Sequence, residues 1–197
     1  MVTACKIKVH GSRFMQKDVR SDLDHWKKSF REELSSHLAT LVLDQDIYGF
    51  ALEPSEELSS MHFITCVGRE SNLKGEVSGS IAWLARRYRH VEWDGFLSSS
   101  DFGESLERLN AMSAKYHDLF INPETCEFTE NGDEFRDTWY AEALDVMIEL
   151  DRVRAFGNIW FKIISFSDFE HPIKKEAFTR LNSGRALHDA ESLFGVG

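Results

Sequence analysis

The spacing of apolar residues predicts three long amphipathic helices. In each, apolar side chains recur at steps of three and four residues, which places them on one face of a helix. We expect the first helix to begin at the N-cap Ser21 and to end before residues 44–46. The second follows capping residues 98–101 and stops near Asn122-Pro123. The apolar stripes are Leu23, Trp26, Phe30, Leu34, Leu38 and Leu41, then Phe102, Leu106, Leu109, Met112, Tyr116 and Leu119.

The third helix follows an Asn131-Gly132 turn and is expected to end at Gly157. Its apolar stripe consists of Phe135, Trp139, Ala143, Val146, Met147, Leu150 and Val153. Beyond it, residues 172–181 are compatible with one further short helix. Residues 81–93, rich in arginine and aromatic side chains, fit neither a helical nor a strand period clearly and stay unassigned.

Three shorter apolar runs predict strands. Residues 47–52 form the first, ended by Pro54, and residues 61–67 form the second, ended by Gly68. Only a short polar tract separates them, so we expect an antiparallel pair. The third run, residues 159–164, is the most apolar and suits the centre of a sheet.

These elements together predict an α+β fold in which amphipathic helices pack against an antiparallel sheet. At 197 residues the chain fits one domain, residues 1–197, with residues 1–20 as an irregular or extended N-terminal segment. Apolar residues make up 42% of the chain, which is enough for a sizeable core.

Composition favours a cytoplasmic protein. No run approaches the roughly twenty apolar residues needed to cross a bilayer, and residues 1–10 lack the pattern of a secretory signal. Cys5, Cys66 and Cys126 are too far apart for a zinc motif or a disulfide framework, so we expect reduced, buried thiols.

Negative charge is concentrated around the third helix. Residues 127–151 carry nine carboxylates and one basic residue, Arg136, a net charge of −8 against −10 for the whole chain. A turn of 100° per residue places four of these carboxylates in one arc opposite the apolar stripe: Glu134, Asp137, Asp145 and Glu149. Such a stripe would attract a basic protein and would repel nucleic acid and anionic membranes. The alternative is that it is simply the solvated face of an amphipathic helix.

Motifs that would specify a reaction fail on inspection. His90-Val91-Glu92 has the His-x-Glu form of nucleobase deaminases, but no Pro-Cys-x-x-Cys follows to complete a zinc site. Ser71-x-x-Lys74 lacks the accompanying elements of a serine nucleophile site. The run 86–90 is too short and the chain too acidic for nucleic-acid binding, so internal pairing with Glu92 or with the acidic helix is expected. We therefore predict no catalytic residues, no metal and no cofactor.

A second interpretation stays open. Arg86, Tyr88, Glu92 and Trp93 lie close together in sequence and combine charge with aromatic surface. They could line the pocket of an enzyme or of a small-ligand-binding protein.

The order of these features resembles a bacterial family of uncharacterised domains found in toxin–immunity loci and, through it, the SUKH immunity proteins. The resemblance spans residues 22–183 and rests on the strand at 48–52, the aromatic segment 88–93, the helix at 139–150, and the late Ser167-Asp168 and Leu181-Asn182 pairs. It implies an immunity protein that neutralises a cognate toxin by forming a stoichiometric complex. The acidic stripe would attract the basic surface of such a toxin, a nuclease for example, and Tyr88 or Trp93 would serve as an aromatic anchor. The oligomeric state stays open.

Overall fold

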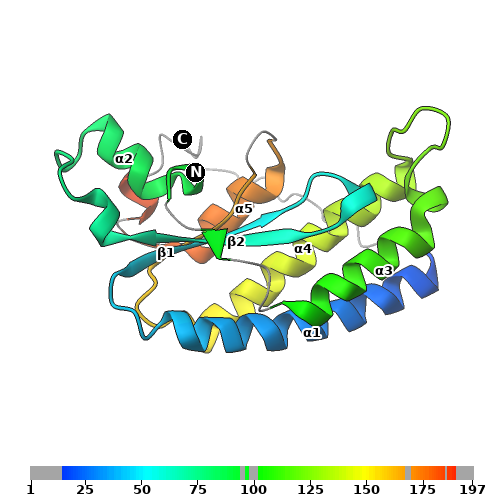
Figure 1. Cartoon of the computed structure of the whole chain (residues 1–197), viewed down its shortest axis with the longest axis horizontal. Coiled ribbons are helices and arrows are strands. Elements are labelled where there is room, and N and C mark those ends of the chain that lie inside the picture. The colour runs from blue at the N-terminus through cyan, green and yellow to red at the C-terminus, as the bar shows by residue number, and fades with distance from the viewer. Residues whose placement is uncertain (1–14, 94–95, 98–101, 167–169, 185, 190–197) are drawn as a thin grey trace, which may run out of the picture.

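The computed structural model describes residues 15–93, 96–97, 102–166, 170–184 and 186–189 (Figure 1). These residues form a sheet with helices on both faces, so the predicted α+β class is confirmed. The elements, in chain order, are α1 (Lys17–Leu41), β1 (Ile47–Pro54), β2 (Phe63–Arg69), α2 (Ile81–Tyr88), β3 (Phe96–Leu97), α3 (Gly103–Phe120), α4 (Glu130–Arg152), β4 (Phe161–Ile164) and α5 (Pro172–Leu181).

The sheet has the strand order β3-β2-β1-β4. The predicted β1–β2 pair is antiparallel, with Phe50 opposite Val67, and β2 extends through Gly68 to Arg69 rather than ending at the glycine. β4 pairs with β1 in parallel, with Gly49 opposite Phe161, so the sheet is mixed.

The prediction that the most apolar strand lies at the sheet centre is wrong, because β4 lies at an edge of the described sheet. Helix α5 packs against this edge, and the Asn182 side chain bonds to the strand itself. Its amide accepts from the Lys162 N–H at 2.9 Å and donates to the Lys162 carbonyl oxygen at 2.6 Å. The side chain thus replaces a neighbouring strand, which is why an edge strand can be fully buried.

Helices α1, α3 and α4 lie on one side of the sheet and α2 lies on the other (Figure 1). Helix α5 runs along the β4 edge and contributes buried residues to the core clusters on both faces. The larger core cluster fills the space between the three long helices and the sheet. At its centre Trp26 stacks on Phe30 and meets the ring of Trp139 edge-on. The smaller cluster, on the opposite face, is dominated by aromatic rings that include Tyr48, Tyr88 and Trp93. Trp83, Trp93 and Trp139 are buried in these clusters, and Trp160 is only partly buried.

Helix α1 begins four residues earlier than its predicted N-cap, Ser21, and so includes part of the predicted irregular segment. Val19 is buried and adds one more turn to the apolar stripe, which stabilises the helix upstream of the serine. Residues 1–14 lie outside the described part of the chain.

Helix α3 has its N-terminus capped by a residue of α1. The Glu33 carboxylate accepts the N–H groups of Glu104 at 2.8 Å and Ser105 at 3.0 Å. A carboxylate at this position pairs orphan donors and complements the helix dipole. The capping residues expected at 98–101 lie outside the described residues.

Helix α4 incorporates the Asn131-Gly132 pair that was predicted to be a turn. Thr129 is the N-cap and accepts the N–H of Gly132 at 3.1 Å. Gly132 packs so closely on the Phe120 carbonyl that a Cβ atom would lie 2.2 Å from its oxygen. The helix ends at Arg152, and Val153, predicted to be part of the apolar stripe, is 69% exposed. Gly157 lies in the turn that follows, with φ at +53°.

The unassigned segment folds as α2 followed by a short 3-10 turn that brings Trp93 onto the sheet. The indole lies against Gly49 of β1 and Gly68 of β2, where any side chain would collide with it. Cys66 is buried nearby, and burial, with the charge of Glu53, raises the pKa of its thiol to about 12. Cys126 is exposed, so the prediction of a buried thiol is wrong there, because it lies in the turn between α3 and α4.

Candidate functional site

The four carboxylates of the predicted acidic stripe lie along one side of α4. The side chains of Asp137, Asp145 and Glu149 are 58%, 49% and 42% exposed, and Glu134 is also partly exposed. The helical spacing thus brings them together as predicted, on the side that faces away from Trp139 and Leu150. A basic group from outside can reach each of them.

Basic residues of the same chain flank this stripe on both sides. Arg31 of α1 lies 3.3 Å from Glu149 and Arg180 of α5 lies 3.6 Å from Asp145. His171, just before α5, places its Nε2 atom 3.2 Å from Asp137. The pairs with Arg31 and Arg180 reduce the local negative potential. The sequence does not predict any of these pairs, because the partners are far apart along the chain.

Two further carboxylates of the acidic segment, Glu142 and Asp151, pair with basic side chains of the same chain. Glu142 is buried and its carboxylate receives Arg20 and Lys27 of α1, each at 2.6 Å. Burial alone would raise the pKa of Glu142, but these two cations lower it below its usual range. Asp151 pairs with the buried Lys162 of β4 at 2.9 Å. Glu142 therefore stabilises packing rather than presenting charge to solvent, and Asp151, which is 37% exposed, neutralises the buried Lys162.

These contacts predict that the protein loses stability in acid. The pKa of Asp137 is lowered by the His171 hydrogen bond, and that of Asp22 by its hydrogen bond with Lys115. A carboxyl with a lowered folded-state pKa stabilises the fold above its unfolded-state pKa and stops doing so as pH falls through the folded value. Urea unfolding should therefore give a constant free energy near pH 7 and a decline from about pH 4.5 downward.

Replacing Glu142 with Gln tests whether its ion pairs with Arg20 and Lys27 stabilise the fold. We expect a loss of about 1–2 kcal/mol at pH 7, because Arg20 and Lys27 lose their shared partner but still reach water. The difference from the wild type should shrink below about pH 4. A difference that stays constant down to pH 3 would contradict the assignment. Glu32→Gln, at an exposed position of the same helix α1, is the control and should change little.

The turn between α3 and α4, together with the first residue of α4, carries a second group of carboxylates. Glu124, Glu127 and Glu130 are exposed, and no lysine or arginine occurs from residue 116 to residue 135. A shallow, mainly apolar recess lies at the same end of the molecule, lined by residues that include Phe120 and Glu134. Acidic residues at the start of α4 also stabilise that helix through its dipole.

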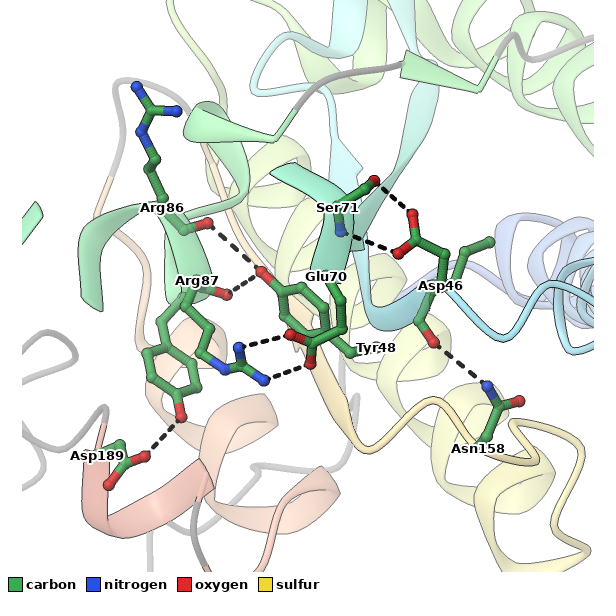
Figure 2. Close-up of polar contacts among 10 residues, drawn as sticks. Asp46, Tyr48, Glu70, Ser71, Arg86, Arg87, Asn158 and Asp189 are labelled. Carbon is green, nitrogen blue, oxygen red and sulfur yellow. Dashed lines mark hydrogen bonds and ion pairs between the residues drawn. The ribbon is translucent and has the colours of Figure 1, made fainter. Parts of the chain in front are cut away.

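A polar network surrounds Arg87 on the opposite face of the sheet (Figure 2). The Arg87 guanidinium makes two bonds to Glu70, and its backbone carbonyl accepts the Tyr48 hydroxyl at 2.9 Å. Arg86 points away from this pair and lies 3.3 Å from Glu76. His90 lies 2.7 Å from Glu53. Internal pairing of Arg86, Arg87 and His90 is thus confirmed, with these three glutamates rather than with the acidic helix, and the side chain of Glu92 lies outside the described part of the chain.

Tyr88 and Trp93 are 0% and 6% exposed. The Tyr88 ring packs edge-on against Phe161, and Trp93 packs on the two sheet glycines. The sequence predicts these two residues as surface anchors or pocket walls. In the structure both are part of the core. For Trp93 the reason is the pair of glycines, which leaves room on the sheet for a large ring. Tyr88 is covered by its ring contacts with Trp160 and Phe161.

Ser71, the serine of the Ser-x-x-Lys pattern, is also part of the scaffold. Its N–H donates to Asp46 Oδ1 at 2.9 Å and its hydroxyl bonds to the other oxygen of the same carboxylate. Among the described residues, no group of three or more His, Cys, Asp or Glu side chains is arranged to hold a metal ion. Within the same residues no helix has the length and apolar content to cross a membrane.

Comparison of the chain with protein-family models, with curated proteins and with solved structures yields no match.

Proposed function

We propose that this chain is an immunity protein that binds a basic bacterial toxin, such as a nuclease, and neutralises it in a stoichiometric complex without turnover. The contact surface is the stripe of Glu134, Asp137, Asp145 and Glu149. The proposal rests on one observation: three of these carboxylates keep about half of their side-chain surface exposed while sharing one side of α4.

The ion pairs within the chain do not close this surface. Arg31 and Arg180 are themselves 55% and 42% exposed, so their pairs with Glu149 and Asp145 are solvent-accessible. Exposed pairs contribute about 0–1 kcal/mol each, and a partner's lysine or arginine can replace the internal cation at little cost. Complementary charge then accelerates encounter and selects basic partners.

The test uses the product of the gene that neighbours the gene of this chain, which the proposal expects to be the toxin. Neutralising the stripe with E134Q, D137N, D145N and E149Q together should reduce the association rate and the affinity by about 100-fold. Calorimetry and stopped-flow mixing measure these quantities, and survival of cells that express the toxin reports protection. The wild-type association rate should also fall with added salt.

A matched control removes the same number of charges elsewhere. Glu32→Gln, Glu57→Gln, Glu76→Gln and Glu107→Gln raise the net charge by the same amount, and Glu76 likewise carries a solvent-accessible ion pair. This variant should bind like the wild type. Full protection by the stripe variant, with its fold verified by circular dichroism, would reject the proposal, as would equal loss in the control.

A further inference from the structure

The guanidinium group of Arg87 is buried, and its carboxylate partner, Glu70, approaches it from the solvent side. The Arg87 side chain is 5% exposed, whereas that of Glu70 is 48% exposed. The Nη1 and Nη2 atoms lie 3.0 Å and 2.5 Å from the two oxygens of Glu70, the bidentate arrangement that an arginine makes with a planar carboxylate (Figure 2).

Three aromatic rings hold the guanidinium in place independently of Glu70. Its central carbon lies 4.6 Å from the ring centre of Tyr48, 4.8 Å from that of Trp83 and 5.1 Å from that of Trp160. Cation–π contacts of this kind fix the plane of the guanidinium and exclude water around it. Among the described residues the Nε–H has no acceptor, so the buried charge depends on the bond to one carboxylate.

Glu70 can leave Arg87 without movement of its backbone. The Glu70 N–H donates to the Asp46 carbonyl at 2.9 Å, and the next residue, Ser71, is bonded to the Asp46 side chain. The main chain here is therefore anchored to Asp46, in the turn between α1 and β1. Rotation of the half-exposed Glu70 side chain alone would uncover the guanidinium.

We infer that Arg87 and its three rings form a carboxylate-binding site that Glu70 occupies as an internal ligand. A carboxylate from outside, either a free carboxylic acid or an acidic side chain of a peptide, competes with Glu70 for the same guanidinium group. This site lies on the face of the sheet opposite α4 and does not depend on the proposed immunity function. Because Glu70 is tethered beside Arg87, its high effective concentration keeps the site closed to weak ligands.

Removing the internal ligand tests the inference. Glu70→Ala should bind acetate at least about tenfold more tightly than the wild type, because the charge-assisted bonds to Arg87 no longer require displacement of Glu70. Titration calorimetry, and melting temperatures in acetate against chloride at equal ionic strength, report the binding. A second arm replaces acetate with a capped tripeptide that contains one aspartate. Binding of both ligands indicates a site open to peptides, and binding of acetate alone restricts it to free acids.

Two further variants keep the result interpretable. Glu76→Ala frees Arg86, which is 52% exposed and lies on the same helix outside the aromatic cage, and it should gain no acetate binding. Glu70→Ala combined with Arg87→Met should lose the binding that Glu70→Ala gains. The inference is overturned if Glu70→Ala binds no acetate, or if Glu76→Ala gains as much. Should Glu70→Ala unfold in chloride, refolding by acetate supports the site, and failure to refold overturns it.

Discussion

Replacing Asn182 with Ala is expected to reduce the free energy of unfolding by about 2–4 kcal/mol. The side chain makes three buried hydrogen bonds: two to the backbone of Lys162 and one, at 2.9 Å, to the carbonyl oxygen of Phe178 at the end of α5. Alanine would leave the N–H and carbonyl groups of the β4 edge buried without partners, and each such group costs about 1–3 kcal/mol before relaxation. Urea unfolding monitored by tryptophan fluorescence measures the loss.

Asn182→Asp distinguishes the hydrogen bond that this side chain accepts from the two that it donates. Aspartate can still accept the Lys162 N–H but cannot donate to the carbonyl oxygens, so it should also destabilise the fold substantially. Ser183→Ala, at the exposed neighbouring position, is the control and should change stability by less than about 0.5 kcal/mol. If Asn182→Ala were as stable as the control, the side chain would not be closing the sheet edge.

The same contact explains one limit of sequence-based prediction here. The long helices could be predicted because burial on one face imposes a period of three to four residues, and the stripe from Leu23 to Leu41 follows it. The position of β4 could not, because an edge strand covered by a helix is as apolar as a central one. What distinguishes the edge strand from a central one is Asn182, which lies far along the chain and is not part of any recognisable sequence pattern.

The candidate sites show a similar division. The arc of Glu134, Asp137, Asp145 and Glu149 follows from helix geometry alone. Which cations neutralise it depends on the packing of α1 and α5 against α4, and that packing is not encoded by neighbours in sequence. The Arg87 cage was missed for the same reason. Its rings come from β1, α2 and the residue before β4, and only the clustering of arginine with aromatic residues in segment 81–93 hinted at it.

Replacing Gly68 with Ala is expected to destabilise the protein by about 2–3 kcal/mol, because it overpacks the aromatic layer. A Cβ atom at this position would lie 2.8 Å from Tyr48 Cζ and 2.9 Å from Trp93 Cε2, closer than carbon atoms approach in proteins. Both rings are buried, so neither can move without shifting others, and the Tyr48 ring is also a wall of the Arg87 cage. Urea unfolding should show the loss, and the fluorescence maximum of the folded state should shift as Trp93 is displaced.

Gly103→Ala is the matched control, because a Cβ atom there meets nothing within 4 Å and the residue opens α3. Alanine favours the helix and restricts the unfolded chain, so this variant should be as stable as the wild type or more stable by about 0.5–1 kcal/mol. The contrast isolates close packing from the general effect of losing a glycine. Equal stability of the two variants would show that Trp93 does not lie on Gly68, and the burial assigned to the aromatic segment would then be wrong.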